Sequence, residues 1–95
     1  MKHSCQHDGL KLVYVAWVDS HSGRGWNDLE NIAAKAEFLH CRSVGWLISE
    51  TKEVMVIVPH LTSGDGDIIV QGCGDITIPK CAIRKVKVIK VRGVQ

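Results

Sequence analysis

Five short apolar runs, each ended by turn-forming residues, recur along the chain. Pro59 and Pro79 end two of them, because proline has no N–H to donate to a strand ladder. Short strands at such close spacing are typical of a small antiparallel barrel. We therefore predict a mainly β (α+β) fold with one domain over residues 1–95. It is a strongly bent five-stranded antiparallel barrel, SH3-like or Sm-like, after a flexible lead-in at residues 1–9. The expected strands are 10–18, 42–49, 53–59, 75–78 and 83–91.

The first strand is apolar on both of its faces. Its even positions include Leu12 and Tyr14, and its odd positions include Val13 and Val15. A strand of this kind needs cover on each side, from the barrel and a helix or from a second subunit. Residues 54–58 are apolar throughout as well. We therefore predict a homo-oligomer that buries this surface and its open strand edges.

One helix is expected between the first and second strands. Asn27 stands at a capping position, and Glu30 follows three residues later, as in a capping box. Apolar residues from Leu29 onward recur at helical spacing, so the helix should end near residues 39–41 and cover the sheet as a lid. The Trp26 ring, directly before the cap, should pack against the first turns of this helix.

The later connections are irregular. Residues 60–67 predict a polar loop, with a short strand fragment at 68–70. Residues 79–82 predict a 3₁₀ turn, because proline has a fixed φ angle and no N–H. In the last strand the apolar residues fall on both faces, and a β-bulge near residues 88–89 would turn them all inward. The outward residues would then be Lys85, Lys87, Lys90 and Arg92.

The net charge is only +2, but the charges are unevenly distributed. Six of the twelve Lys and Arg residues lie within positions 80–92, where no acidic residue occurs. This pattern predicts a positive surface that attracts phosphate-bearing partners. The alternative is that the basic residues only keep an exposed edge strand soluble and unpaired.

Four cysteines, at positions 5, 41, 73 and 81, form no Cys-x-x-Cys pair, which small zinc sites usually contain. The segment His3-Ser4-Cys5-Gln6-His7 and the pair His40–Cys41 contain metal-ligand side chains. A terminal segment with strand-like spacing is poorly preorganised for a metal, however. We predict no metal and no cofactor, and we expect Cys41 and Cys81 to be buried as small apolar side chains.

Composition places the chain among folded globular proteins, with 45% apolar and 23% charged residues. No apolar run approaches the length that a membrane-spanning helix requires. The first eight residues lack the apolar core of a secretory signal. We therefore predict a cytoplasmic protein with no membrane partner.

No arrangement of residues predicts catalysis. Asp19, Ser20 and His21 are the residue types of a catalytic triad, but consecutive residues of an extended chain point in opposite directions and cannot form one relay. Gly64-Asp65-Gly66-Asp67 resembles part of a calcium loop, yet the later glutamate and the flanking helices of an EF-hand are absent. We predict that the protein is not an enzyme.

A ligand site is expected around the polar loop before the helix. A partly exposed Trp26 indole beside Arg24 and His21 can stack a base and hold a phosphate. Lys80, at the rim of the barrel, would meet an anion. The predicted ligand-binding residues are therefore His21, Arg24, Trp26 and Lys80. The alternative is that Trp26 only anchors the helix.

Five short motifs are distributed over residues 11–89. They are Val-Ala-Trp-Val-Asp-Ser (15–20), Gly-Trp (25–26), Ser-Val-Gly-Trp-Leu-Ile (43–48), Val-Ile-Val-Pro-His (56–60) and Ile-Pro-Lys-x-x-Ile (78–83). Together they resemble a widespread group of small accessory proteins of tailed bacteriophages. The resemblance implies a phage product in the cytoplasm of an infected bacterium, and it carries no catalytic residues.

From these features we predict a non-catalytic phage binding protein that counters a host or defence component by sequestering a phosphate-bearing nucleotide. One alternative is a protein–protein inhibitor, whose helix or edge strand docks on a host enzyme. Another is an Sm-like module that binds DNA or RNA through Lys85, Lys87, Lys90 and Arg92. We expect that binding to be weak and salt-sensitive, because Tyr14 and Phe38 lie far from these residues in the sequence.

Overall fold

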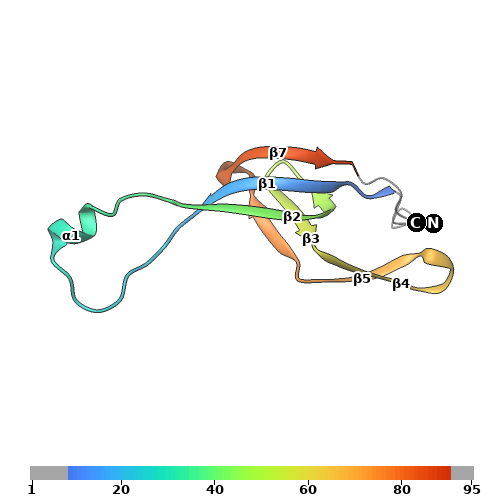
Figure 1. Ribbon diagram of the computed structural model, residues 1–95, viewed down its shortest axis with the longest axis horizontal. Coiled ribbons are helices and arrows are strands. Elements are labelled where there is room, and N and C mark those ends of the chain that lie inside the picture. Colours follow the sequence, from blue (N-terminus) through green and yellow to red (C-terminus); the bar gives the residue numbers. More distant parts are fainter. Residues whose placement is uncertain (1–8, 91–95) are drawn as a thin grey trace.

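The structure, a computed structural model, describes residues 9–90 and is mainly β (Figure 1). The strands are β1 Leu12–Asp19, β2 Leu39–Glu50, β3 Val54–Val58, β4 His60–Ser63, β5 Ile69–Cys73, β6 Ile76–Pro79 and β7 Ile83–Ile89. The other elements are the helix α1 Leu29–Ala33 and the 3₁₀ turns η2 Asp65–Asp67 and η3 Lys80–Ala82. Five strands form one sheet in the order β6-β3-β2-β1-β7, and β4 pairs separately with β5.

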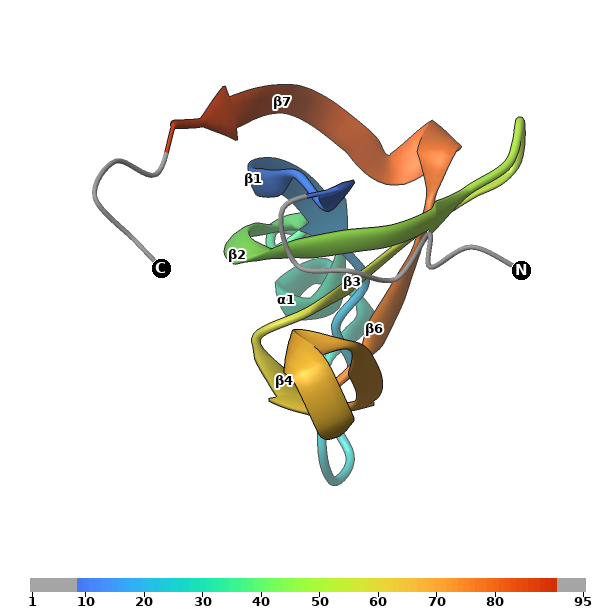
Figure 2. The same cartoon turned by 90° about the vertical axis from the view of Figure 1, so that its right-hand side faces the viewer.

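All five strands predicted from the apolar runs are present in the large sheet, and each of its ladders is antiparallel. The closed barrel is not confirmed, because β6 and β7 are the two edge strands and no ladder joins them within residues 9–90. The sheet is nevertheless strongly bent. Figure 2 shows its strands curving around a common interior.

The bend lies in β2, the longest strand. Its first part pairs with β1 as far as Trp46, and its second part pairs with β3 from Trp46 onward. The register shifts between Leu47 and Ser49, and such a shift adds local twist. Gly45 lies at this bend, and a Cβ atom there would stand 2.9 Å from the Val58 carbonyl oxygen. Glycine therefore allows β3 to approach β2 this closely.

The core lies on the inner side of the bent sheet. Val13 and Val15 of β1 form a buried cluster with Ile57 of β3 and Ile78 of β6. Each such aliphatic side chain contributes about 1.5–3 kcal/mol when it is fully buried. The odd face of β1 is thus covered, as predicted. The other members are the buried Met55 and, partly buried around it, Trp17, Leu47, Ile76 and Ile83.

The prediction of a long helix that covers the sheet is wrong. α1 has only five residues, and none of them is buried. Asn27 does not cap it, because Asp28 is the N-cap and the Asn27 side chain donates instead to the Arg24 carbonyl oxygen at 3.0 Å. Most helices in proteins depend on tertiary packing of an apolar face for their stability. α1 projects away from the sheet (Figure 1), so the helical spacing of residues 34–39 has no surface to pack on.

The connection from β3 to β7 is more regular than predicted. The expected polar loop is wrong for residues 60–63, because β4 and β5 form a hairpin in which His60 pairs with Cys73, whereas residues 64–67 form the turn and the strand fragment predicted at 68–70 overlaps β5. The hairpin turns at η2, where Gly66 has a φ of +67° that favours glycine. Pairing across the turn, rather than local apolar content, makes these residues strands. The predicted 3₁₀ turn is confirmed as η3, with Pro79 at its N-cap and a φ of −63°.

The predicted bulge near residues 88–89 is also wrong. The β1–β7 ladder is regular over residues 85–89, and the register shift falls at Arg84 instead. The shift leaves Arg84 without a partner position on β1. Along the regular stretch, alternate side chains therefore point to opposite faces of the sheet.

This alternation changes the faces of β7. Val86 and Val88 are opposite core residues of β1, yet they remain 41% and 58% exposed. Lys85 and Lys87 lie on the outer face, away from the core, together with Ile89. Among the described residues, only Lys85 and Lys87 of the predicted outward row share a face of β7, so the predicted row is wrong.

The close approach at Gly45 generates a test of the bend. We expect Gly45→Ala to lower the free energy of unfolding by about 1–3 kcal/mol, because the added methyl group overpacks against the β3 backbone. Denaturant unfolding measures the change. Gly23→Ala is the matched control, since no atom lies within 4 Å of a Cβ there, and we expect a change within about 0.5 kcal/mol. Equal effects of the two variants would contradict the packing argument.

Candidate functional site

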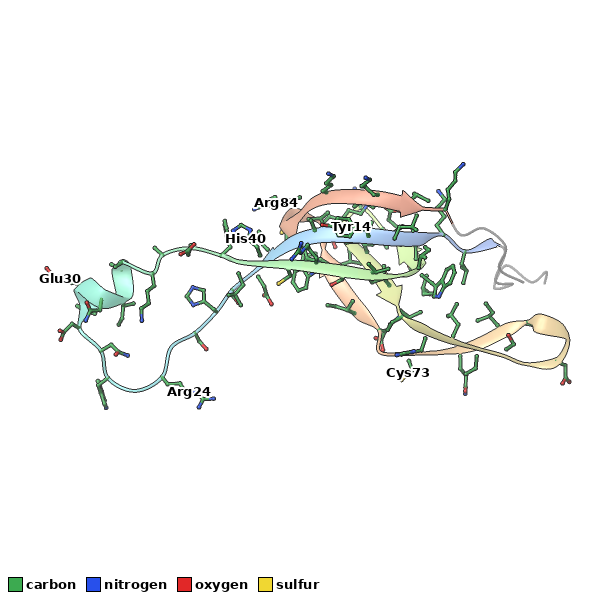
Figure 3. The ribbon with its side chains drawn as sticks, in the orientation of Figure 1. Tyr14, Arg24, Glu30, His40, Cys73 and Arg84 are labelled. Atoms are coloured by element: carbon green, nitrogen blue, oxygen red, sulfur yellow. The ribbon has the colours of Figure 1, made fainter. Side chains whose placement is uncertain are left out.

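Three of the predicted ligand residues lie on a projecting segment, residues 20–38, which we call the arm. His21, Arg24 and Trp26 are all exposed, as is every other residue of the arm. A 2.9 Å hydrogen bond joins the Nε2 of His21 to the carbonyl oxygen of Glu37, so the ring is held near the end of the arm that returns to the sheet. Arg24 extends outward from the arm (Figure 3).

Trp26 does not pack against the helix as predicted. Its relative exposure is 102%, so the indole contacts nothing that would shield it from water. The ring is available for stacking, but no opposing wall in the described residues would hold a ligand against it. Sequestration of a small nucleotide requires such a wall, because small-molecule sites bury most of their ligand.

Lys80 is separate from the arm. It belongs to η3, beside the sheet, and its Nζ donates to the Glu50 Oε2 at 2.6 Å. Its backbone N–H donates to the Glu53 carbonyl oxygen at 2.8 Å. The four predicted ligand residues are therefore divided between the arm and η3, and the structure does not bring them together.

A second group of residues does come together, on the outer face of β1 and its two neighbours. Tyr14 pairs with Lys87, and Ala16 pairs with Lys85 on one side and with Arg42 on the other. Residues paired across an antiparallel ladder share a face, with Cβ atoms about 4.5–5.5 Å apart. Tyr14, Arg42, Lys85 and Lys87 thus form one surface, which we call the basic face.

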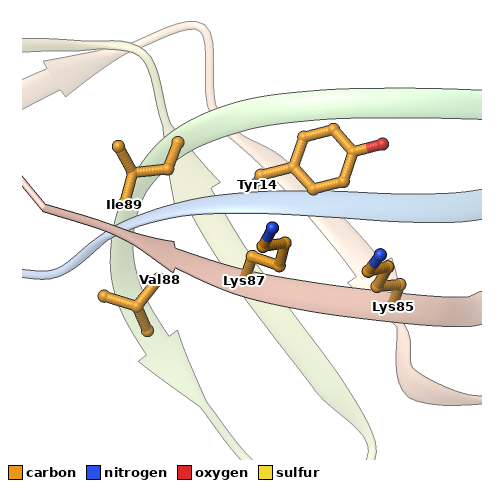
Figure 4. Close-up of a pocket in the computed structure, with 5 residues that line it drawn as sticks. All are labelled: Tyr14, Lys85, Lys87, Val88 and Ile89. Carbon is orange, nitrogen blue, oxygen red and sulfur yellow. The ribbon is translucent and has the colours of Figure 1, made fainter.

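The basic face combines an aromatic ring with cations. Figure 4 shows the Tyr14 ring and the ammonium groups of Lys85 and Lys87 on the same side of the strands. With Val88 and Ile89, these residues line an open depression of about 520 Å³. Tyr14 is half-buried, whereas both lysines are exposed. The positions that β1, β7 and residues 40–46 of β2 contribute to this face include no acid.

These residues are far apart in the sequence, so the sequence did not show that they are neighbours. Tyr14 is far from the basic strand in the sequence. However, β1 and β7 are hydrogen-bonded neighbours, so the ring lies directly opposite Lys87. Phe38 is also far from the basic strand in the sequence, yet the Arg84 guanidinium lies 5.6 Å from the centre of its ring. The expected fold was the signal that could have found this site, because β1 and β7, the first and last strands, pair with each other.

Of the predicted basic row, Lys85 and Lys87 belong to β7 as the structure describes it. Lys90 follows the end of β7 and is exposed. Arg92 falls outside the described residues. The cations that the described ladders bring to one face are therefore Lys85, Lys87 and Arg42, and the last of these was not among the predicted residues.

Other chemistry has little structural support. Among residues 9–90, no three His, Cys, Asp or Glu side chains gather as metal ligands. Cys41 is half-buried, whereas Cys73 and Cys81 are exposed, and all three are free thiols. The predicted burial of Cys81 is wrong, because no residue of η3 is buried. In the same part of the chain, no helix is long and apolar enough to cross a membrane.

Comparison with known proteins adds no identification. No family model, no curated protein and no solved structure matches the chain. The resemblance to small bacteriophage proteins therefore stays a prediction from the five motifs.

The Lys80–Glu50 ion pair generates a stability prediction. The two side chains are 34% and 44% exposed, so water screens the attraction. We expect Lys80→Ala to change the free energy of unfolding by less than about 1 kcal/mol. Thermal or denaturant unfolding checks this, with Glu50→Gln as the partner variant. A loss well above that value in both variants would contradict a screened, marginal pair.

Proposed function

We propose that the protein is a non-catalytic binding protein that holds a single-stranded nucleic acid on its basic face. The observation that carries this proposal is the pairing of Tyr14 with Lys87, beside Lys85. An aromatic ring next to cations is the combination that single-strand sites use, because the ring stacks a base while the cations meet phosphates. The sequence alone did not show that the Tyr14 ring lies beside these lysines.

The shape of the site favours a strand over a mononucleotide. The depression is open, and Lys85 and Lys87 lie about 7 Å apart along β7 at the usual strand rise. A row of this kind can follow a phosphate backbone, while the bases remain accessible. A sequestered small ligand would instead need an enclosed cavity that buries most of its surface.

The other hypotheses from the sequence remain predictions. Nucleotide sequestration by His21, Arg24, Trp26 and Lys80 has less support, since these residues lie in two separate places. Inhibition of a host enzyme would use the exposed arm or an edge strand. A role against a host or defence component in the cytoplasm of an infected bacterium rests on the bacteriophage resemblance alone.

We include in this proposal that the bent sheet is the open form of an SH3-like or Sm-like barrel. η3 joins β6 directly to β7, so the edge strand β6 ends at the same corner where the edge strand β7 begins. Such a barrel would close at that corner. The strand order, with the last strand beside the first, agrees with this topology.

Fluorescence anisotropy with a labelled DNA or RNA strand of about 12 nucleotides tests the proposed binding. We expect Tyr14→Ala to weaken binding about tenfold, because one base loses its stacking partner. Tyr14→Phe keeps the ring and should bind within about twofold of the unmodified chain. Equal losses in the two variants would assign the effect to the hydroxyl group and contradict stacking.

The salt dependence tests the cations separately. We expect Lys85→Ala/Lys87→Ala to reduce the slope of log K against log salt by about 1.4, since each phosphate contact on a single strand contributes about 0.7. The charge-matched control is Lys35→Ala/Lys52→Ala, which removes two lysines outside the basic face. A similar reduction in the control would show general attraction only. Mononucleotides, measured in parallel, should compete poorly.

A further inference from the structure

Every residue of the arm is exposed, and Phe38, near its base, lies against the Arg84 guanidinium of the same chain. It leaves the sheet after Asp19 and returns at Leu39, and these two residues pair at its base. The molecule measures 59 × 26 × 24 Å, with the arm at one end and the β4–β5 hairpin at the other (Figure 1). The radius of gyration is 17.8 Å, against about 12 Å for a compact chain of this length.

The arm also exposes several large apolar side chains. Trp26 is fully exposed, Leu29 is 82% exposed, and Ile32 and Phe38 are 53% and 56% exposed. Four large apolar side chains exposed on one short segment favour an interaction surface. Large aromatic and aliphatic side chains are also the usual anchors at the centre of protein interfaces.

A matching surface exists on the same chain. β7 is an edge strand of the large sheet, so its outer ladder positions are unpaired in residues 9–90. On its inner side, Val86 and Val88 are 41% and 58% exposed, although they face the core side of the sheet. An exposed edge with uncovered valines is a surface that a second chain can complete.

The charges of the two surfaces are complementary. The arm contains three acids and two basic residues, which leaves one net negative charge: Asp28, Glu30 and Glu37 against Arg24 and Lys35. Among the basic residues at 84–90, Lys85 and Lys87 belong to the basic face, which leaves Arg84 and Lys90 for this surface, and no acid occurs in this range. Complementary charge steers encounter and disfavours docking of an arm on another arm.

We propose that the arm of one copy docks on the inner side and free edge of β7 in a second copy. A two-fold pair, in which each copy supplies its own arm and receives the arm of the other, buries the exposed apolar residues of both surfaces on each copy, whereas one arm on one β7 buries them only once. Lys85 and Lys87 of the basic face lie on the opposite side of β7, although Val88 also lines the depression beside them.

The first experiment measures mass by light scattering on the full chain at about 50 µM, where an interface of micromolar Kd is mostly occupied. We expect the unmodified chain to self-associate, and we expect Trp26→Ser/Leu29→Ser to weaken self-association at least tenfold. Both residues are exposed, so the variant should fold normally, as far-UV circular dichroism would verify. Ile48→Ser is the control, because Ile48 is 45% exposed on β2, at the end of that strand away from the arm.

A monomeric unmodified chain at this concentration, or an arm variant that associates as tightly as the unmodified chain, would overturn the proposal. Loss of association in the arm variant but not in the control would support it. Raised salt should weaken the association, because the two surfaces carry opposite charge.

A second experiment identifies the contact even if one variant misbehaves. Trp26 is replaced by the photocrosslinker p-benzoylphenylalanine, and ¹⁴N-labelled and ¹⁵N-labelled samples are mixed before irradiation. Crosslinked peptides that join an arm of one isotope to residues 83–90 of the other would support docking between copies. Crosslinks only within one isotope, or only to other segments, would refute it.

Discussion

β1 is hydrogen-bonded to β2 along one edge and to β7 along the other, and the remaining structure depends on this double pairing. It places Val13 and Val15 at the centre of the sheet, where residues of β3 and β6 bury them. It also places Tyr14 between β2 and β7 on the opposite side. A strand with alternating side chains therefore supplies the core with one face and the candidate site with the other.

The bend of β2 makes the core possible. A flat sheet would leave β6 far from β1, and Ile78 could not reach the valines. Because β2 turns at Gly45 and shifts register after Leu47, β3 and β6 fold over the inner face of β1. The close backbone contact at Gly45 and the burial of a few aliphatic residues are thus parts of one constraint. The arm and the β4–β5 hairpin lie outside it.

The two faces of β7 have different chemistry because its ladder with β1 is regular beyond Arg84. Lysines and Tyr14 occupy one side, and exposed valines occupy the other. A phosphate-bearing strand and a second copy of the chain would consequently approach β7 from opposite sides. The two surfaces share Val88, which also lines the depression of the basic face, and self-association would bring basic faces of neighbouring copies into one assembly.

The sequence by itself determined where the strands of the large sheet lie, because the apolar runs and the prolines at 59 and 79 act locally. It also predicted η3 correctly from the fixed φ of Pro79. It did not determine the length of α1, since a helix stops where it has nothing to pack against. Three features depend on which strands become neighbours: the bulge at Arg84, the pairing of β4 with β5, and the pairing of Tyr14 with Lys87. Register between strands far apart in the sequence is a tertiary property, so only the folded sheet decided the candidate site.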